Sequence, residues 1–153
     1  MLKIHQQFAE LKSNISQHTL QNSMVSNVPI GWHIDHCLLV VEAIIEQVNL
    51  SNPSNYKWQF NKLRLIVFML NKIPRGKAKA PNIVIPNSYT AESLLEHLET
   101  AKLRFTTLQT MQPKQYFKHH VFGHLHLKAT VKFLQIHTLH HLKIIRDIIK
   151  NRP

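Results

Sequence analysis

The stretch FLQIHTLHHLKIIRDIIK, residues 133–150, places two histidines one helical turn apart within an apolar face. His137 and His141 are four residues apart, so their side chains lie on the same side of a helix. Leu134, Ile144 and Ile148 continue that side, which we therefore expect to point into the protein. A buried imidazole without a partner costs about 1–3 kcal/mol. An i,i+4 pair can avoid this cost by presenting two nitrogens to one metal ion.

The best candidate for a third ligand among the twelve histidines is His36, in GWHIDHCLLVVEAIIEQV at 31–48. Val40 and Ile44 follow it at helical spacing, so His36 also belongs to an apolar face. His33, one turn earlier on nearly the same face, is its rival. Three neutral imidazoles with open positions beside them describe a reactive metal site rather than a closed structural one. The competing interpretation is that core histidines are satisfied by protein groups and bind no metal.

The composition favours one helical domain, covering residues 1–153. The chain is 44% hydrophobic and has only three glycines, which disfavours a turn-rich β fold. Its single cysteine, Cys37, excludes an internal disulfide and fits a reducing compartment. No apolar run reaches the length of a membrane span, and the N-terminus lacks a signal-peptide pattern. We therefore expect a soluble, cytoplasmic protein with no membrane partner.

The chain is strongly basic, with a formal net charge of +11. Its one local cluster is Arg75, Lys77 and Lys79, in the segment IPRGKAKAPNIVIP at 73–86. We rank a solvated basic surface first and a loop that binds an anionic substrate second. A nucleic-acid surface ranks third, because no helix-turn-helix, zinc-finger or stacked-aromatic pattern accompanies the cluster.

Helical periodicity predicts an all-α protein. Four long helices are expected, at 2–22, 32–49, 90–110 and 127–150. Thr90 is a plausible N-cap, and a shorter extra helix is expected at 59–72. The connections at 73–87 and 119–126 are expected to be loops. Long amphipathic helices without an alternating strand pattern predict a helical bundle, in whose core facing helices build metal sites.

Short motifs resemble a known family. Trp32 near the start of the second helix with His36 shortly after, and the terminal motif His137-Thr138-Leu139-His140-His141, resemble the DinB/YfiT-like superfamily of metalloenzymes. The resemblance spans the whole chain in helix order, although only these motifs are specific. The PRGKAKAP loop and the HHVFG turn are most similar to an uncharacterised subgroup.

This resemblance implies an up-down-down-up four-helix bundle with a zinc or nickel ion near one end. The ligands carried over are His36, His137 and His141, and His140 becomes a neighbour rather than a ligand. In many members the histidine of the second helix lies about two turns after the tryptophan, whereas His36 is only four residues after Trp32. The choice between His33 and His36 therefore stays open.

The resemblance also suggests chemistries for a small-molecule substrate. Relatives include S-transferases and isomerases that use small thiols such as bacillithiol, mycothiol or glutathione, and others are described as metal-dependent hydrolases. A divalent ion could activate either a thiol or a water. Glu42 lies about 120° from the His36 face of a helix, so it is poorly placed as a hydrolytic base. We therefore favour thiol transfer, with a hydrolase or a non-catalytic binding bundle as alternatives and no catalytic residue assigned.

The segment FNKLRLIVFML at 60–70 has more apolar residues than one buried face requires. One face contains Leu63, Ile66, Val67 and Leu70, and outside it lie Leu65, Phe68 and Met69. Surplus apolar surface usually marks an interface, and relatives in the superfamily are often homodimers. We therefore expect a symmetric homodimer, with this segment in or beside the contact. The alternative is that the segment packs wholly against its own bundle.

Overall fold

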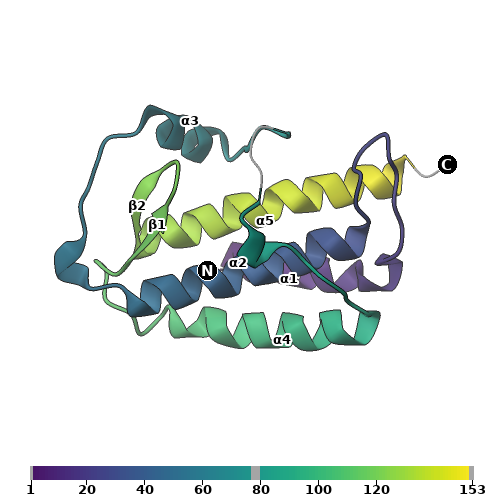
Figure 1. The fold of residues 1–153 in the computed structure, drawn as a ribbon, viewed down its shortest axis with the longest axis horizontal. Coiled ribbons are helices and arrows are strands. Elements are labelled where there is room, and N and C mark those ends of the chain that lie inside the picture. Colours follow the sequence, from purple (N-terminus) through teal and green to yellow (C-terminus); the bar gives the residue numbers. More distant parts are fainter. Residues whose placement is uncertain (1, 77–79, 152–153) are drawn as a thin grey trace.

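The computed structural model describes residues 2–76 and 80–151. Over these residues the chain forms five α-helices and one small antiparallel sheet (Figure 1). The helices are α1 (Leu2–Ser13), α2 (Ile30–Leu50), α3 (Lys62–Leu70), α4 (Ala91–Thr107) and α5 (Leu127–Lys150). The strands are β1 (Tyr116–His119) and β2 (Gly123–His126). The fold is therefore mainly helical, as the periodicity predicts.

The strands correct two expectations, because the fold is not all-α and residues 119–126 are not an irregular loop. β1 and β2 pair antiparallel, with Phe117 opposite Leu125. These two side chains are buried, whereas Lys118 on the next position is exposed. Gly123 adopts a positive φ of 73° where the chain turns into β2, a conformation that glycine tolerates best. The hairpin packs against α2 and α5 and closes one end of the core.

The predicted boundaries of the second, third and fourth long helices lie within three residues of those in the structure, whereas the first helix differs. The helix expected at 2–22 ends at Ser13 and is followed by a short 3-10 turn, Ile15–Gln17. Asn14 explains why the helix ends here. Its side-chain amide donates a hydrogen bond of 2.7 Å to the Glu10 carbonyl, and this bond competes with continuation of the helix. Thr90 is the N-cap of α4, as predicted, and its side chain accepts a hydrogen bond from the Ser93 amide.

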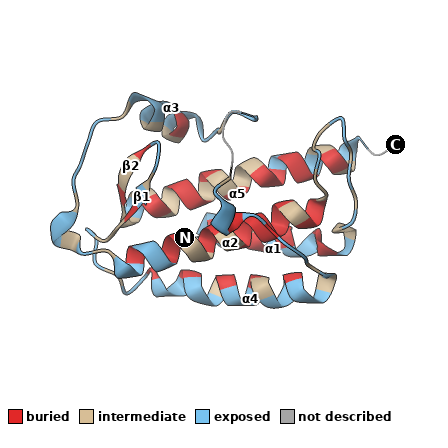
Figure 2. Cartoon of the chain, in the orientation of Figure 1, coloured by how far each residue is buried: buried red, intermediate tan, exposed pale blue. Residues whose placement is uncertain are grey.

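The long helices form the core. α2 packs against α4 and α5, and α1 packs against α5 and α4. Figure 2 shows the buried residues on the sides of these helices that face one another. Phe8 of α1 and Phe105 of α4 meet edge to face, with ring centroids 5.9 Å apart. This packing holds α2 beside α5 along much of their length, which positions the histidines of both helices.

The short helix α3 lies outside that core. Only Val67 of its nine residues is buried, so the segment does not pack wholly against its own bundle. Leu63, Ile66 and Leu70, which share a predicted face with Val67, are 48%, 53% and 66% exposed. No helix in the described ranges is long and apolar enough to cross a membrane.

We expect Leu98→Ala to lower the free energy of unfolding by about 2–5 kcal/mol, because the Leu98 side chain is fully buried and its removal leaves a cavity. Leu103→Ala, on the same helix but 72% exposed, should change it by less than about 0.5 kcal/mol. Urea unfolding followed by circular dichroism measures both. Equal effects at the two positions would contradict this packing of α4.

Candidate metal centre

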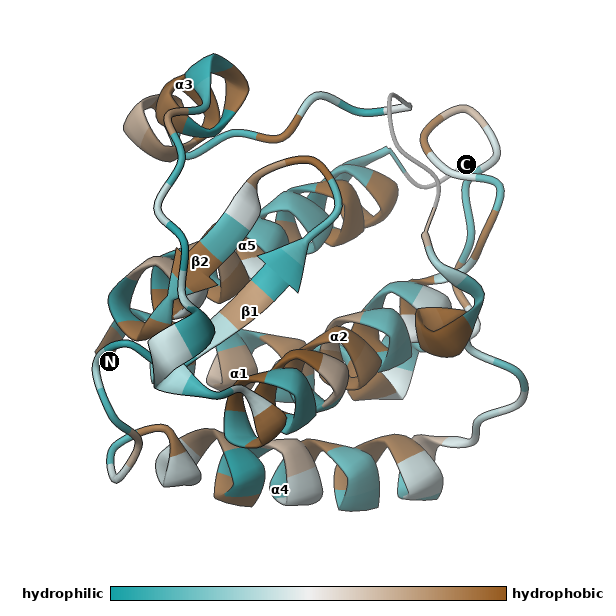
Figure 3. Ribbon diagram, turned by 60° about the vertical axis from the view of Figure 1, so that its left-hand side comes forward, coloured by the Kyte–Doolittle hydropathy of each residue, from teal (hydrophilic) through white to brown (hydrophobic). Residues whose placement is uncertain are grey.

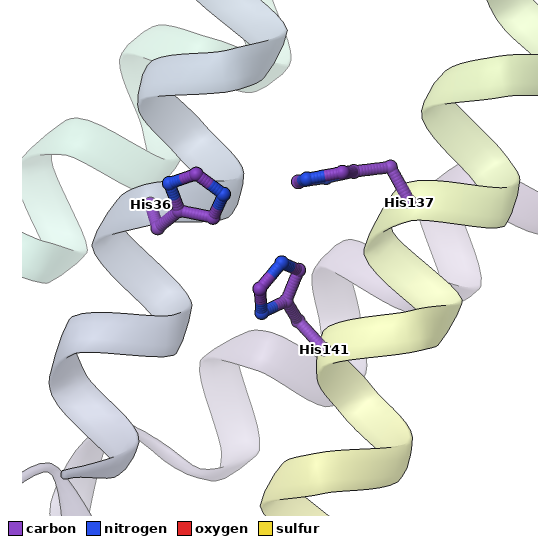
Figure 4. Close-up of side chains that lie close together, drawn as sticks. All are labelled: His36, His137 and His141. Carbon is purple, nitrogen blue, oxygen red and sulfur yellow. The ribbon is translucent and has the colours of Figure 1, made fainter. Parts of the chain in front are cut away.

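The core contact between α2 and α5 brings three histidines together. His36 comes from α2, and His137 and His141 come from α5 (Figure 4). One ring nitrogen from each residue lies within 4.8 Å of the other two. The ring centroids are 5.1 Å apart for His36 and His137, 4.8 Å for His36 and His141, and 4.7 Å for the α5 pair. The i,i+4 pair and His36 thus converge on one small space.

The pKa values of all three imidazoles in this cluster are lowered, which favours their neutral form. His36 and His141 are only 4% and 8% exposed, and His137 is partly exposed. Burial is the main cause that lowers the pKa of each, well below the ordinary histidine value for His137 and His141. Neighbouring imidazoles lower the pKa of the α5 pair further, since two cations so close would repel. Neutral imidazole is the form that binds a metal ion.

His36 is oriented by two neighbours. Its Nδ1 donates a hydrogen bond of 2.7 Å to the backbone carbonyl of Val84, in the segment that joins α3 to α4. A carbonyl can only accept, so the proton lies on Nδ1 and the Nε2 lone pair is free. Trp32, one turn earlier on α2, stacks on the ring at a centroid distance of 4.9 Å and an angle of 14°. Both contacts fix the ring and leave Nε2 available for a ligand.

His33 contacts the cluster as a partner of His141. Its Nδ1 lies 3.0 Å from Nδ1 of His141, and its Nε2 lies 2.9 Å from the Ser26 hydroxyl. His33 is itself buried, and burial lowers its pKa to about 4. For Nε2 of His141 to bind a metal, His141 must donate from Nδ1 to His33, and His33 must donate from Nε2 to Ser26. Of the two histidines left open by the sequence, His36 is the one within the three-nitrogen group.

His137 differs from the other two because its ring makes no hydrogen bond to the residues that the structure describes. It packs against Phe133, at a centroid distance of 5.9 Å, and against the other two rings. It is also the most exposed of the three. The group therefore includes one partly exposed ring, and the nitrogens of this ring make no hydrogen bond to the described residues.

The other candidate site residues from the sequence are not members of the three-histidine group. The His140 ring is 5.0 Å from His141, edge to face, and partly exposed, so it lies beside the cluster rather than in it. Arg75 forms an ion pair with Asp147 of α5, at 2.6 Å, while its charge lowers the pKa of His33 and His140. Arg75 thus lies near the cluster with a partner already bound. Lys77 and Lys79, the other members of the predicted anion-binding loop, fall outside the described residues.

The carboxylates nearest in sequence are turned towards α4. Asp35 binds Nδ1 of His97 at 2.6 Å, and Glu42 lies 3.6 Å from both His97 and Arg104. These contacts raise the pKa of His97. In the described part of the chain no carboxylate is a member of the three-histidine group. Cys37 is not in the group either, and burial raises the pKa of its thiol.

Sequence reasoning missed a further histidine near His137. His119, at the end of β1, accepts hydrogen bonds at Nδ1 from the amides of Val121 and Phe122, at 3.0 and 3.2 Å. Its ring lies 4.8 Å from Phe133, which contacts His137. Burial lowers its pKa to about 4, so it is neutral with the proton on Nε2. The sequence predicts a loop at 119–126, and only recognition of the hairpin would place His119 here.

No protein-family model matches this chain, and neither a curated protein nor a solved structure does. Function is therefore inferred from the geometry and chemistry of the histidines.

We expect the metal-free protein to lose stability as the pH falls from about 6.5 to about 4. The clustered histidines have folded-state pKa values below the ordinary value, so the unfolded chain binds more protons in this range. The free energy of unfolding is then highest above pH 6.5, and each unit of pKa depression contributes about 1.4 kcal/mol there.

Urea titrations at a series of pH values test this dependence. His33→Asn removes one buried imidazole, so its free energy of unfolding should decline less steeply with falling pH than that of the wild type. His120→Ala, which removes an exposed imidazole, is the matched control and should follow the wild type. Identical slopes for wild type and His33→Asn would show that burial of this ring does not resist protonation.

Proposed function

We propose that this protein binds a divalent transition-metal ion through His36, His137 and His141. The observation that carries the proposal is the convergence of three neutral imidazoles on one space without a carboxylate among them. A cluster of core histidines that served packing alone would be expected to have a protein partner for each ring, and His137 has none in the described ranges. A shared metal ion would satisfy all three rings at once.

The donor set fits zinc or nickel. Both ions accept imidazole nitrogen, and three protein ligands leave positions open for a substrate. The backbone carbonyl of Val84 would orient His36, and the chain from His33 to Ser26 would orient His141. Such outer partners fix the tautomer and direction of a ligating histidine. His137 is the partly exposed ligand, so a small molecule would approach the ion from its side.

Among enzymatic roles, we favour transfer to or from a small cellular thiol. When bound, the ion would supply Lewis acidity, which lowers the pKa of a thiol held beside it. This role needs no carboxylate base, and Asp35 and Glu42 are both engaged with His97. Arg75 lies at the edge of the cluster in an ion pair with Asp147, and an anionic thiol such as glutathione would bind there by replacing that carboxylate. A metal-dependent hydrolase would need a base that the three-histidine group does not contain.

The same site supports the resemblance to DinB/YfiT-like proteins. We infer that α1, α2, α4 and α5 form an up-down-down-up four-helix bundle of that type. The contacts of α2 with α4 and α5, and of α1 with the same two helices, support this arrangement. Trp32 and His36 on one helix facing His137 and His141 on another support the carried-over site.

We expect His36→Ala, His137→Ala and His141→Ala each to abolish stoichiometric binding of zinc or nickel, since each leaves two protein ligands. His33→Ala should weaken affinity by about 10- to 100-fold without removing the site, because it orients His141. Isothermal titration of metal-free, untagged protein measures these affinities, and elemental analysis measures occupancy.

His120→Ala, at an exposed histidine outside the cluster, is the control and should bind as the wild type does. Full occupancy in any of the three ligand variants would overturn the ligand assignment. If His33→Ala abolished binding while His36→Ala retained it, the site would lie one turn earlier on α2. A wild type that binds no ion would support histidines that only fill the core.

We expect the cobalt-loaded protein to develop a thiolate-to-cobalt charge-transfer absorption when glutathione is added, because a small thiol reaches the open side of the site. Arg75→Ala should weaken the apparent glutathione affinity by about three- to tenfold through the loss of one nearby charge, and leave metal content unchanged. The control is Arg146→Ala on α5, which removes a similarly exposed arginine that is paired with Glu10 of α1. Absence of the absorption, together with ester hydrolysis, would favour the hydrolase.

A further inference from the structure

We propose that the surface formed by α3 and the segment before it docks onto an anionic lipid membrane. This surface, called here the α3 face, comprises the exposed residues of segment 57–60 and of α3. The proposal concerns a surface contact and not a membrane span. It is independent of the metal site.

The α3 face exposes large apolar side chains at unusual density. Figure 3 shows hydrophobic residues on α3, which stands apart from the long helices there and in Figure 1. Those more than 45% exposed are Trp58, Phe60, Leu63, Leu65, Ile66, Met69 and Leu70, at 66%, 63%, 48%, 49%, 53%, 71% and 66%. A large apolar patch exposed to water on a protein surface marks an interaction site.

Hydrogen bonds and a ring contact hold one side of α3 against the β1–β2 hairpin. Arg64 donates to the carbonyls of Phe122 and His124, at 3.2 and 3.4 Å, and Phe68 meets Phe122 edge to face. Asn61, the N-cap, also donates to the Val121 carbonyl at the tip of the hairpin. These contacts hold α3 against the hairpin on the side that carries Arg64, Val67 and Phe68.

The opposite side of α3 faces water. At 100° per residue, Lys62, Ile66 and Met69 lie opposite the Arg64 side, with Leu65 and Leu70 flanking them. Their exposed fractions agree with that placement. An amphipathic helix whose apolar face is turned outward suits insertion into the boundary between lipid headgroups and acyl chains, where Trp and Phe are also favoured.

The charge around the α3 face is positive only. The chain has no Asp or Glu between Glu46 and Glu92, nor between Glu99 and Asp147, and these stretches contain α3 and the hairpin. Exposed lysines lie before α3, within it, after it and on β1, at Lys57, Lys62, Lys72 and Lys118. A basic rim around apolar side chains matches the negative surface potential of a membrane rich in anionic lipids.

The positive charge distinguishes among three possible partners of the α3 face: a second copy of the chain, a nucleic acid and a lipid membrane. A second copy of the chain would bring two acid-free, positive surfaces together, so the expected dimer is disfavoured here. A nucleic acid would suit the positive charge, but aliphatic side chains such as Leu65, Ile66 and Leu70 offer bases no stacking surface. A membrane rich in anionic lipids matches both features, because its hydrocarbon suits the apolar side chains and its headgroups suit the positive charge. Membrane docking differs from two predictions made from the sequence, a dimer contact at this segment and the absence of a membrane partner, and both of these stay predictions.

Co-sedimentation with vesicles tests the proposal. The wild-type protein should bind vesicles of phosphatidylcholine mixed with phosphatidylserine at least about tenfold more tightly than vesicles of phosphatidylcholine alone, and added salt should weaken the binding. The double variant Ile66→Glu/Met69→Glu should lose about tenfold or more of this affinity, because it places two charges on the inserting side. Both changed side chains are exposed, and the variant's melting temperature checks that the fold is retained.

Leu103→Glu is the matched control, since Leu103 is 72% exposed on α4 and outside the α3 face. It should bind vesicles as the wild type does. The proposal is overturned if the wild type binds neither vesicle, if both vesicles bind equally, or if the double variant binds as tightly as the wild type. It is also overturned if the wild type sediments as a dimer that the double variant dissociates, or if the face binds single-stranded DNA in preference to vesicles.

Discussion

The contact between α2 and α5 imposes the constraint on which the candidate site depends. It encloses uncharged imidazoles in a space whose three-nitrogen group includes no carboxylate. Each ring is polar, so burying it without a hydrogen-bond partner or a metal ion costs free energy. His36 uses a backbone carbonyl and His141 uses another histidine, whereas His137 has no hydrogen-bond partner among the described residues. A shared cation is the simplest way to complete such a cluster.

The connection between α3 and α4 contacts the two helices that carry this cluster, once on each side of residues 77–79. Near its start Arg75 pairs with Asp147 of α5, and further along Val84 accepts the hydrogen bond from His36 of α2. Val84 is itself buried, so its carbonyl is held in place by packing. A movement of this connection would therefore turn the His36 ring. The orientation of one candidate ligand is thus coupled to a segment that is distant in sequence.

The parts that the sequence could predict were those with a strong local period. Spacing placed His137 and His141 on one face, and the apolar neighbours of His36 placed it inward, but the separation from Trp32 left His33 as a rival. The choice depended on tertiary contacts, because His33 and His36 both face the core and differ in which partner they meet. The Val84 carbonyl could not be foreseen, since a backbone group has no identity in the sequence.

The hairpin was missed for a different reason. Each strand has four residues, so Phe117 and Leu125 supply only one buried position apiece, too few to establish an alternating period. For α3 the sequence predicted surplus apolar residues at an interface and left packing against the rest of the chain as the alternative; only Val67 is buried, so that alternative is wrong and the interface stays a prediction. Periodicity reports which residues share a side of a helix, but it does not report what covers that side.

The distribution of charge connects the histidine cluster with its surroundings. Asp35 and Glu42, on α2, are paired with His97 and Arg104 of α4, so their negative charge is largely compensated on that side. On the other side Arg75 lowers the pKa of His33 and His140. Positive charge near a histidine disfavours its protonation and attracts anions by the same electrostatic potential. Arg75 is itself paired with Asp147, so the site is suited to a metal ion whose further ligand is an anion that replaces this carboxylate at Arg75.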